Sequence, residues 1–195
     1  MARRKRKSKR EANKRPRSPT IVSPLRKIAD ITPLPPGVAE LDPDKTVITL
    51  KAIFTEAPAG MCFDILKRQL EEPHQWDSVI VNVWPVSNIR GAIGATSQVT
   101  LNLGGRKLAS LAVICRYHLN RAISWVLSEK PKVREDWRLE QKPHGTTVHV
   151  NFALELKGWP IGRFLYKLLR HKKVENDLDR MLVQLKETVE ITSHD

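Results

Sequence analysis

The feature of the sequence that most limits its fold is a series of short segments between residues 92 and 156 that read as β-strands. Turn residues separate them at close intervals, at Gly104-Gly105, near Asn120 and at Pro143-His144-Gly145. Strands joined by such short turns pair antiparallel with their neighbours. The predicted strands of this region are Ala92–Leu103, Ser110–His118, Arg121–Ser128, Val133–Gln141 and Thr146–Leu156.

Two more strands and a helical segment are predicted upstream. In TVITLKAIF, from Thr46, alternation puts four apolar residues on one face of a half-buried strand, namely Ile48, Leu50, Ala52 and Phe54. Pro58 is suited to the first turn of a helix, so one or two short helices are expected before Pro73. A short strand is expected at Val79–Trp84.

The last predicted element is a long amphipathic helix from Pro160 to about Val189. Its apolar residues recur at helical spacing, as Ile161, Phe164, Leu165, Leu168, Leu178, Met181, Leu182, Leu185 and Val189. A helix with one apolar stripe needs a sheet to lie on, and a sheet with one apolar face needs a cover. Residues 45–190 are therefore predicted to form one α+β domain, with this helix on an antiparallel sheet of about seven strands.

The N-terminal part of the chain has a different character. Residues 1–19 are basic and, after Met1, contain no large apolar residue, which predicts a disordered tail. Residues 20–44 mix prolines with scattered apolar residues, which is typical of an extended linker. Residues 1–30 hold twelve Lys or Arg against Glu11 and Asp30, so only +3 of the total charge of +13 belongs to the rest of the chain.

The order of these elements resembles the SRPBCC superfamily, the START-like and polyketide-cyclase-like helix-grip domains that include a coenzyme-Q-binding branch. The resemblance is carried by EAPAGMCFDIL (56–66), HQWDSV (74–79), KPHGTTVHVNFALEL (142–156) and the terminal helix. It implies a strongly curved sheet of about seven strands, two short helices after the first strand and a closing helix. A cavity for a hydrophobic molecule is expected between sheet and helix. The basic tail and the linker lie outside this pattern.

Alternation along each strand indicates which side chains would line that cavity. The inward set of the strand at 110–118 is predicted to be Leu111, Val113, Cys115 and Tyr117. Together with the closing helix, the predicted cavity residues are Tyr117, Ile123, Trp125, Glu135, Trp137, Val150, Phe152, Phe164 and Leu168. His149 falls on the outward face of its strand.

Glu135 is the anomaly, because it shares an otherwise apolar face with Val133 and Trp137. One interpretation is that Glu135, with Tyr117, orients a polar head group or acts as an acid or base. The other is that Glu135 lies near the strand end at the cavity mouth, is solvated, or pairs with a nearby arginine. Burial without such a partner would raise its pKa.

Other chemistry finds little support in the sequence. The six histidines do not pair with Cys or carboxylates at metal-ligand spacing, so neither a metal nor a cofactor is expected. Cys62 and Cys115 are expected to be small buried hydrophobic residues. No run of eighteen apolar residues exists to span a membrane, and the expected location is the cytoplasm, with peripheral membrane contact as an option.

The function predicted first is binding, and transport, of a lipid, quinone or polyketide-like compound. The first alternative is a polyketide cyclase or dehydratase that uses Glu135 or Tyr117. The second is an RNA- or ribosome-associated protein, because ten Lys or Arg within residues 3–17 suit a polyanion such as nucleic acid or an anionic membrane.

Overall fold

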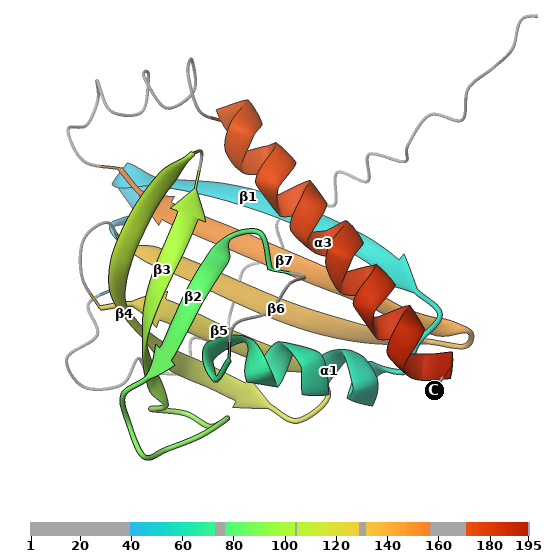
Figure 1. The fold of residues 1–195 in the computed structure, drawn as a ribbon. Coiled ribbons are helices and arrows are strands. Elements are labelled where there is room, and N and C mark those ends of the chain that lie inside the picture. Colours follow the sequence, from blue (N-terminus) through green and yellow to red (C-terminus); the bar gives the residue numbers. More distant parts are fainter. Residues whose placement is uncertain (1–39, 73–76, 104, 129–131, 157–170, 195) are drawn as a thin grey trace, which may run out of the picture. The chain divides into compact units, whose positions relative to one another are not determined.

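A seven-stranded antiparallel sheet forms the centre of the fold (Figure 1). The computed structural model describes residues 40–72, 77–103, 105–128, 132–156 and 171–194. The strands are β1 Thr46–Thr55, β2 Ile80–Pro85, β3 Thr96–Leu103, β4 Arg106–His118, β5 Ala122–Leu127, β6 Val133–Lys142 and β7 Gly145–Glu155. Their order is β1-β7-β6-β5-β4-β3-β2, so β1 adds to the far edge of a run of consecutive hairpins. The predicted sheet of about seven strands is confirmed.

A short helix follows the first strand, as predicted. Helix α1 spans Ala59–Lys67 directly after Pro58, and a single 3-10 turn, η2 Arg68–Leu70, continues it. Another short 3-10 turn, η1 Pro43–Lys45, leads into β1. The side chain of Gln141 in β6 caps α1, since its Oε1 accepts a hydrogen bond from the backbone N–H of Ala59 at 2.8 Å. This bond satisfies one of the free N–H groups at the start of the helix.

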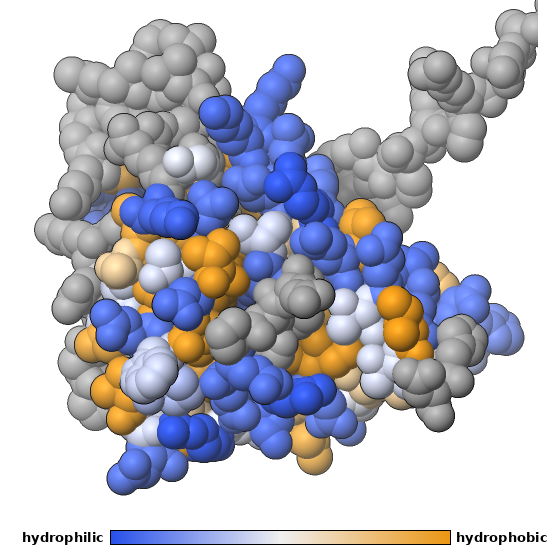
Figure 2. Space-filling model, in the orientation of Figure 1, coloured by the Kyte–Doolittle hydropathy of each residue, from blue (hydrophilic) through white to orange (hydrophobic). Residues whose placement is uncertain are grey.

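The long helix α3, His171–His194, lies across the sheet and contacts β1, β3 and α1 (Figure 1). Its buried stripe consists of Val174, Leu178, Met181, Leu182, Leu185 and Val189. Polar contacts fasten it to the edge strand: Lys51 Nζ lies 2.9 Å from a carboxylate oxygen of Asp179, and Thr55 Oγ1 donates to Glu190 at 3.1 Å. The side of α3 turned away from the sheet is mostly hydrophilic (Figure 2). We call the sheet face that α3 covers the inner face.

The prediction for the buried face of β1 was wrong. Ile48, Leu50 and Phe54 are 53%, 61% and 43% exposed, whereas Thr49 and Thr55 are buried. In the register, Thr49 is opposite Phe152 of β7, so Thr49 and Thr55 lie on the inner face together with Val47 and Ile53, which pack against the core. Alternation shows which residues share a face but not which face turns inward, and here the face with Lys51 and Thr55 turns toward Asp179 and Glu190 of α3.

The predicted inward set of β4 was wrong in part. Leu111, Val113 and Cys115 do not belong to the core cluster. Ile114 is opposite Trp125 and belongs to the core, which places Ile114 on the inner face. A register shift between Ile114 and Arg116 then returns Tyr117 to the inner side, opposite Ile123. Such a bulge adds one residue to a strand and reverses the alternation beyond it, which the sequence pattern did not reveal.

Several predictions concern residues outside the described ranges. They include the basic tail at 1–19, nearly all of the linker at 20–44, and residues 157–170 at the start of the predicted C-terminal helix. Among the helices that are described, none is long and apolar enough to cross a membrane.

Candidate functional site

Five of the predicted cavity residues lie together with Glu135 on the inner face of β5, β6 and β7. The six form two rows in the register, Trp125–Glu135–Phe152 and Ile123–Trp137–Val150. All of them are buried. Their side chains point to the same side because residues directly opposite one another in an antiparallel pair share a face. The sequence therefore placed these six side chains on one face correctly, while their role as a cavity lining stays a prediction.

Tyr117 extends the second row into β4, since it lies opposite Ile123. Its side chain is partly buried and its ring meets that of Phe63 of α1 edge to face, with centroids 5.2 Å apart and an interplanar angle of 76°. Such a geometry is favourable for two aromatic rings. Tyr117 thus belongs to the contact between the sheet and α1. Phe164 and Leu168 lie outside the described residues.

Glu135 is fully buried, with a relative exposure of 0%. Its Oε1 accepts three hydrogen bonds, from Gln69 Nε2 at 2.8 Å, Trp125 Nε1 at 3.2 Å and Trp137 Nε1 at 2.5 Å. Among the described residues, Glu135 makes no ion pair with Lys, Arg or His within 4 Å. The second interpretation of Glu135 is therefore wrong: it lies neither in solvent nor in a pair with a described arginine.

A second carboxyl, that of Asp77, lies close to Glu135. Gln69 connects the two, because its Nε2 donates to Asp77 Oδ2 at 2.8 Å and to Glu135 Oε1 at 2.8 Å. Asp77 Oδ1 accepts the backbone N–H groups of Val79 and Ile80 at 2.8 and 2.7 Å. Burial, and next the charge of Asp77, raises the pKa of Glu135 to about 8. The Glu135 carboxyl thus holds its proton at neutral pH.

Gln69 and Asp77 were not found from the sequence. Gln69 follows Ile65 and Leu66 at helical spacing, so it lies on the apolar side of α1 and η2, and a polar residue in that position was a usable signal. Asp77 stands two and three residues before the amides it bonds, which is a common role for Asp at the start of a strand or turn. Only the tertiary fold brings Gln69 and Asp77 close to Glu135.

The cysteines and possible metal ligands offer little further chemistry. Burial raises the pKa of the Cys62 thiol to about 11 and also raises that of Cys115, so both stay protonated. In the part of the chain that the structure describes, no three His, Cys, Asp or Glu side chains gather in a way that could hold a metal ion.

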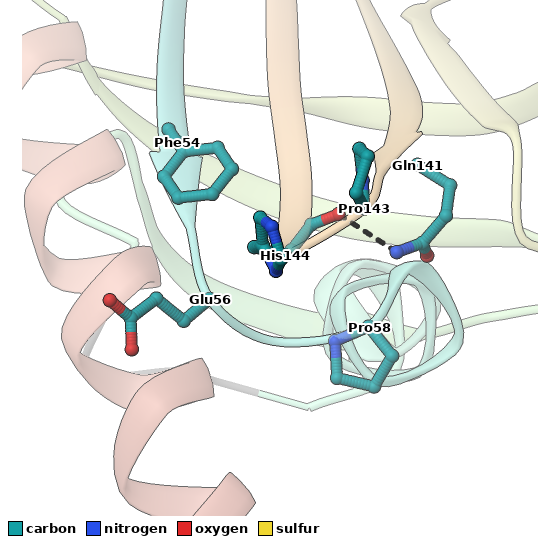
Figure 3. A pocket seen from close by; sticks show the side chains of 7 residues that line it. Phe54, Glu56, Pro58, Gln141, Pro143 and His144 are labelled. Carbon is teal, nitrogen blue, oxygen red and sulfur yellow. Dashed lines mark hydrogen bonds between the residues drawn. The ribbon is translucent and has the colours of Figure 1, made fainter.

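A separate hollow of about 590 Å³ lies at the end of the molecule where β1 leads into α1 and β6 turns into β7 (Figure 3). It is lined by Phe54, Glu56, Pro58, Gln141, Pro143, His144 and Gly145. Most of these residues are exposed, and none of them was predicted as a cavity residue. The side-chain amide of Gln141 already makes a hydrogen bond within the protein, because its Nε2 donates to Gly145 O at 2.8 Å. This hollow is distinct from the inner face around Glu135.

Comparisons with known proteins agree with this architecture. No protein-family model and no curated protein matches the sequence. Among solved structures, TTHA0849 from Thermus thermophilus has a TM-score of 0.62 at 17% identity, covering 75% of this chain and 99% of that one. A START superfamily protein from Mycobacterium smegmatis has a TM-score of 0.59 at 18% identity, covering 74% and 98%.

A third similar structure is the di-domain ARO/CYC protein BexL from the BE-7585A biosynthetic pathway. It has a TM-score of 0.54 at 14% identity, covering 75% of this chain and 50% of that one. At such low identities the similarity concerns the backbone arrangement and not the site residues. The resemblance of fold expected from the sequence is confirmed: this chain has the helix-grip fold of the START-like and polyketide-cyclase-like structures.

Proposed function

We propose that the protein binds a hydrophobic small molecule between the inner face of β5–β7 and helix α3. The observation that carries the proposal is a buried, mostly apolar face on β5–β7 that carries the carboxyl of Glu135. Small-molecule sites are mostly apolar with a few placed polar groups. The likeness of fold to a START superfamily protein and to an ARO/CYC protein supports the same class of ligand. Lipids, quinones and polyketide-like compounds are the proposed candidates, and carriage is the proposed role.

Binding can be measured by energy transfer from the buried Trp125 and Trp137 to the fluorescent fatty acid cis-parinaric acid. Val150→Phe adds bulk to the inner face, whereas His149→Phe adds it to the neighbouring, partly exposed outward position. We expect Val150→Phe to weaken binding by about tenfold and His149→Phe to leave it unchanged. Equal affinities of the two variants, with both still folded by their thermal melts, would contradict binding on the inner face.

Cyclase or dehydratase chemistry on the bound molecule is the second candidate function. It is favoured by Glu135, because a carboxyl that keeps its proton near neutral pH is suited to general acid catalysis. Conversion of a bound polyketide by the natural chain and its loss in Glu135→Gln would support the enzyme. Binding without conversion by the natural chain would support the carrier.

We also propose that the basic tail brings the protein, in the cytoplasm, to a polyanionic partner. Residues 3–17 hold ten Lys or Arg, and such a segment binds RNA or an anionic membrane through the release of counterions. Deletion of residues 2–19 should then remove most RNA or anionic-vesicle affinity. An affinity of the full chain that does not fall with rising salt would contradict this role.

A further inference from the structure

The two carboxyl oxygens of Glu135 have different surroundings. Oε1 accepts N–H bonds from Gln69, Trp125 and Trp137, which leaves it little capacity for a further donor. Oε2 is also buried, and it has no hydrogen-bond partner among the described residues. A buried polar atom without a partner costs about 1–3 kcal/mol, so a molecule that supplies one is bound more tightly.

The hydrogen bonds to Glu135 also indicate which of its two carboxyl oxygens carries the proton. Because Oε1 is filled by three donors, it acts as the carbonyl oxygen of the protonated acid, and Oε2 carries the hydrogen. The elements around Glu135 present Gln69 from η2, Trp125 from β5 and Phe152 from β7, none of which titrates. Asp77 is the charged group that acts on Glu135, and as an anion it favours the neutral form of its neighbour.

We propose that Glu135 Oε2–H is the polar anchor of the bound molecule, and that it selects apolar ligands with a hydrogen-bond-accepting oxygen, such as a ketone or quinone carbonyl. This inference rests on the proposed function, because it requires a ligand on the inner face. The neutral acid donates one hydrogen bond to a carbonyl oxygen, while the apolar body of the ligand lies against side chains such as Phe152 and Val150. An alkylammonium ligand is disfavoured, since an ammonium group has no lone pair to accept the Oε2–H hydrogen.

Three probes of twelve carbons test the anchor, namely methyl decyl ketone, dodecylamine and dodecane, each displacing cis-parinaric acid from the full chain. At pH 6 the ketone should bind about tenfold more tightly than dodecane, which is the size of one hydrogen bond to a buried group. As the pH rises through about 8, Glu135 loses its proton and the preference for the ketone should disappear. Dodecane affinity should stay constant, which controls for a general loss of structure.

The outcomes separate this inference from the proposed function. If none of the three probes binds and cis-parinaric acid does not bind either, both fail. If dodecane binds and the ketone shows no preference or no pH dependence, only the anchor fails. Preferred binding of dodecylamine at pH 6 would also overturn the anchor, because an ammonium group cannot accept a hydrogen bond from Oε2–H.

Two variants sharpen the result. Glu135→Gln keeps a donor at this position, so it should still prefer the ketone, but without the pH dependence. Glu135→Leu has no donor and should bind ketone and dodecane equally. Should either variant fail to fold, the pH profile of the natural chain with ketone and dodecane still decides the question, since it requires no substitution.

Discussion

At the level of single residues, the buried carboxyl of Glu135 is the polar group of the inner face on which our proposals depend. Its carboxyl is completely buried, bonded on one oxygen by Gln69, Trp125 and Trp137, and close to the carboxyl of Asp77. Such a group is tolerated because three N–H bonds offset part of the cost of burial, and because it folds in its neutral form. The stability of the protein should therefore depend on the proton of Glu135.

The free energy of unfolding should fall as the pH rises from about 4.5 to about 8. Glu135 has a folded pKa of about 8 against an ordinary value of 4.5, so its proton stabilises the fold fully below the lower value. That contribution is lost by the time the pH exceeds the upper value, at a cost on the order of a few kcal/mol. Urea titrations at several pH values measure it.

Glu135→Gln is the matched control for this prediction, because an amide does not titrate. The difference in unfolding free energy between the natural chain and the variant should change with pH over that window. Parallel pH profiles for the two proteins would show that Glu135 is already ionised, or that it is not buried as described.

Gly145 is the residue where backbone geometry should tolerate substitution least. Its φ is 152°, and a Cβ atom there would lie 2.1 Å from the backbone oxygen of Thr55. We expect Gly145→Ala to lower the unfolding free energy by about 3 kcal/mol or more. Gly105→Ala is the control, because Gly105 has a φ of 78° but no atom within 4 Å of an added Cβ. It should cost only about 1 kcal/mol, and equal losses in chemical denaturation would contradict the close contact at Gly145.

How far single residues could be predicted depends on the range of the interactions involved. Glu135 was recognisable because a charged residue interrupted an apolar alternation within its own strand. Gln69 and Asp77 were not, since they come from a helical turn and a loop that only the folded chain brings to β6. Tyr117 was placed on the correct face although its neighbours were not, because a bulge before it reversed the alternation.

At the level of elements, helix α3 and the inner face of the sheet stabilise each other. The buried stripe of α3 lies on the sheet, while Asp179 and Glu190 bond Lys51 and Thr55 of β1. The helical spacing predicted this stripe correctly from Leu178 to Val189, but Val174 was missed. The orientation of β1 could not be predicted, because its apolar residues Ile48 and Leu50 turn away from the helix.

The contribution of α3 can be measured with two substitutions on opposite sides of the helix. Leu178 is completely buried, so Leu178→Ala should lower the unfolding free energy by about 2–5 kcal/mol. Val183 is 48% exposed, and Val183→Ala should change the unfolding free energy by less than about 0.5 kcal/mol. Similar losses for both variants in urea denaturation would mean that α3 does not lie on the sheet by this stripe.

At the level of the whole molecule, two regions are candidates for the binding site that we propose. One is the inner face around Glu135, where Gln69 of η2 contacts the sheet, and the other is the exposed hollow near Phe54 and His144 (Figure 3). The inner face has many buried apolar side chains and an acid oxygen, Glu135 Oε2, that has no hydrogen-bond partner among the residues described. The hollow is lined mostly by exposed residues. The side-chain amide of Gln141 in its wall already makes hydrogen bonds to Ala59 and Gly145. We therefore propose the inner face, and not the hollow, as the binding site.

Photo-labelling with a long-chain ketone that carries a diazirine tests this assignment most directly, because the bound molecule marks the residues it touches. After irradiation of the full chain, peptide mass spectrometry should find the label on β5–β7 inner-face residues and on the buried stripe of α3, with competition by unlabelled methyl decyl ketone. Competable labelling confined to Phe54, Pro143 and His144, or no competable labelling anywhere, would contradict the assignment.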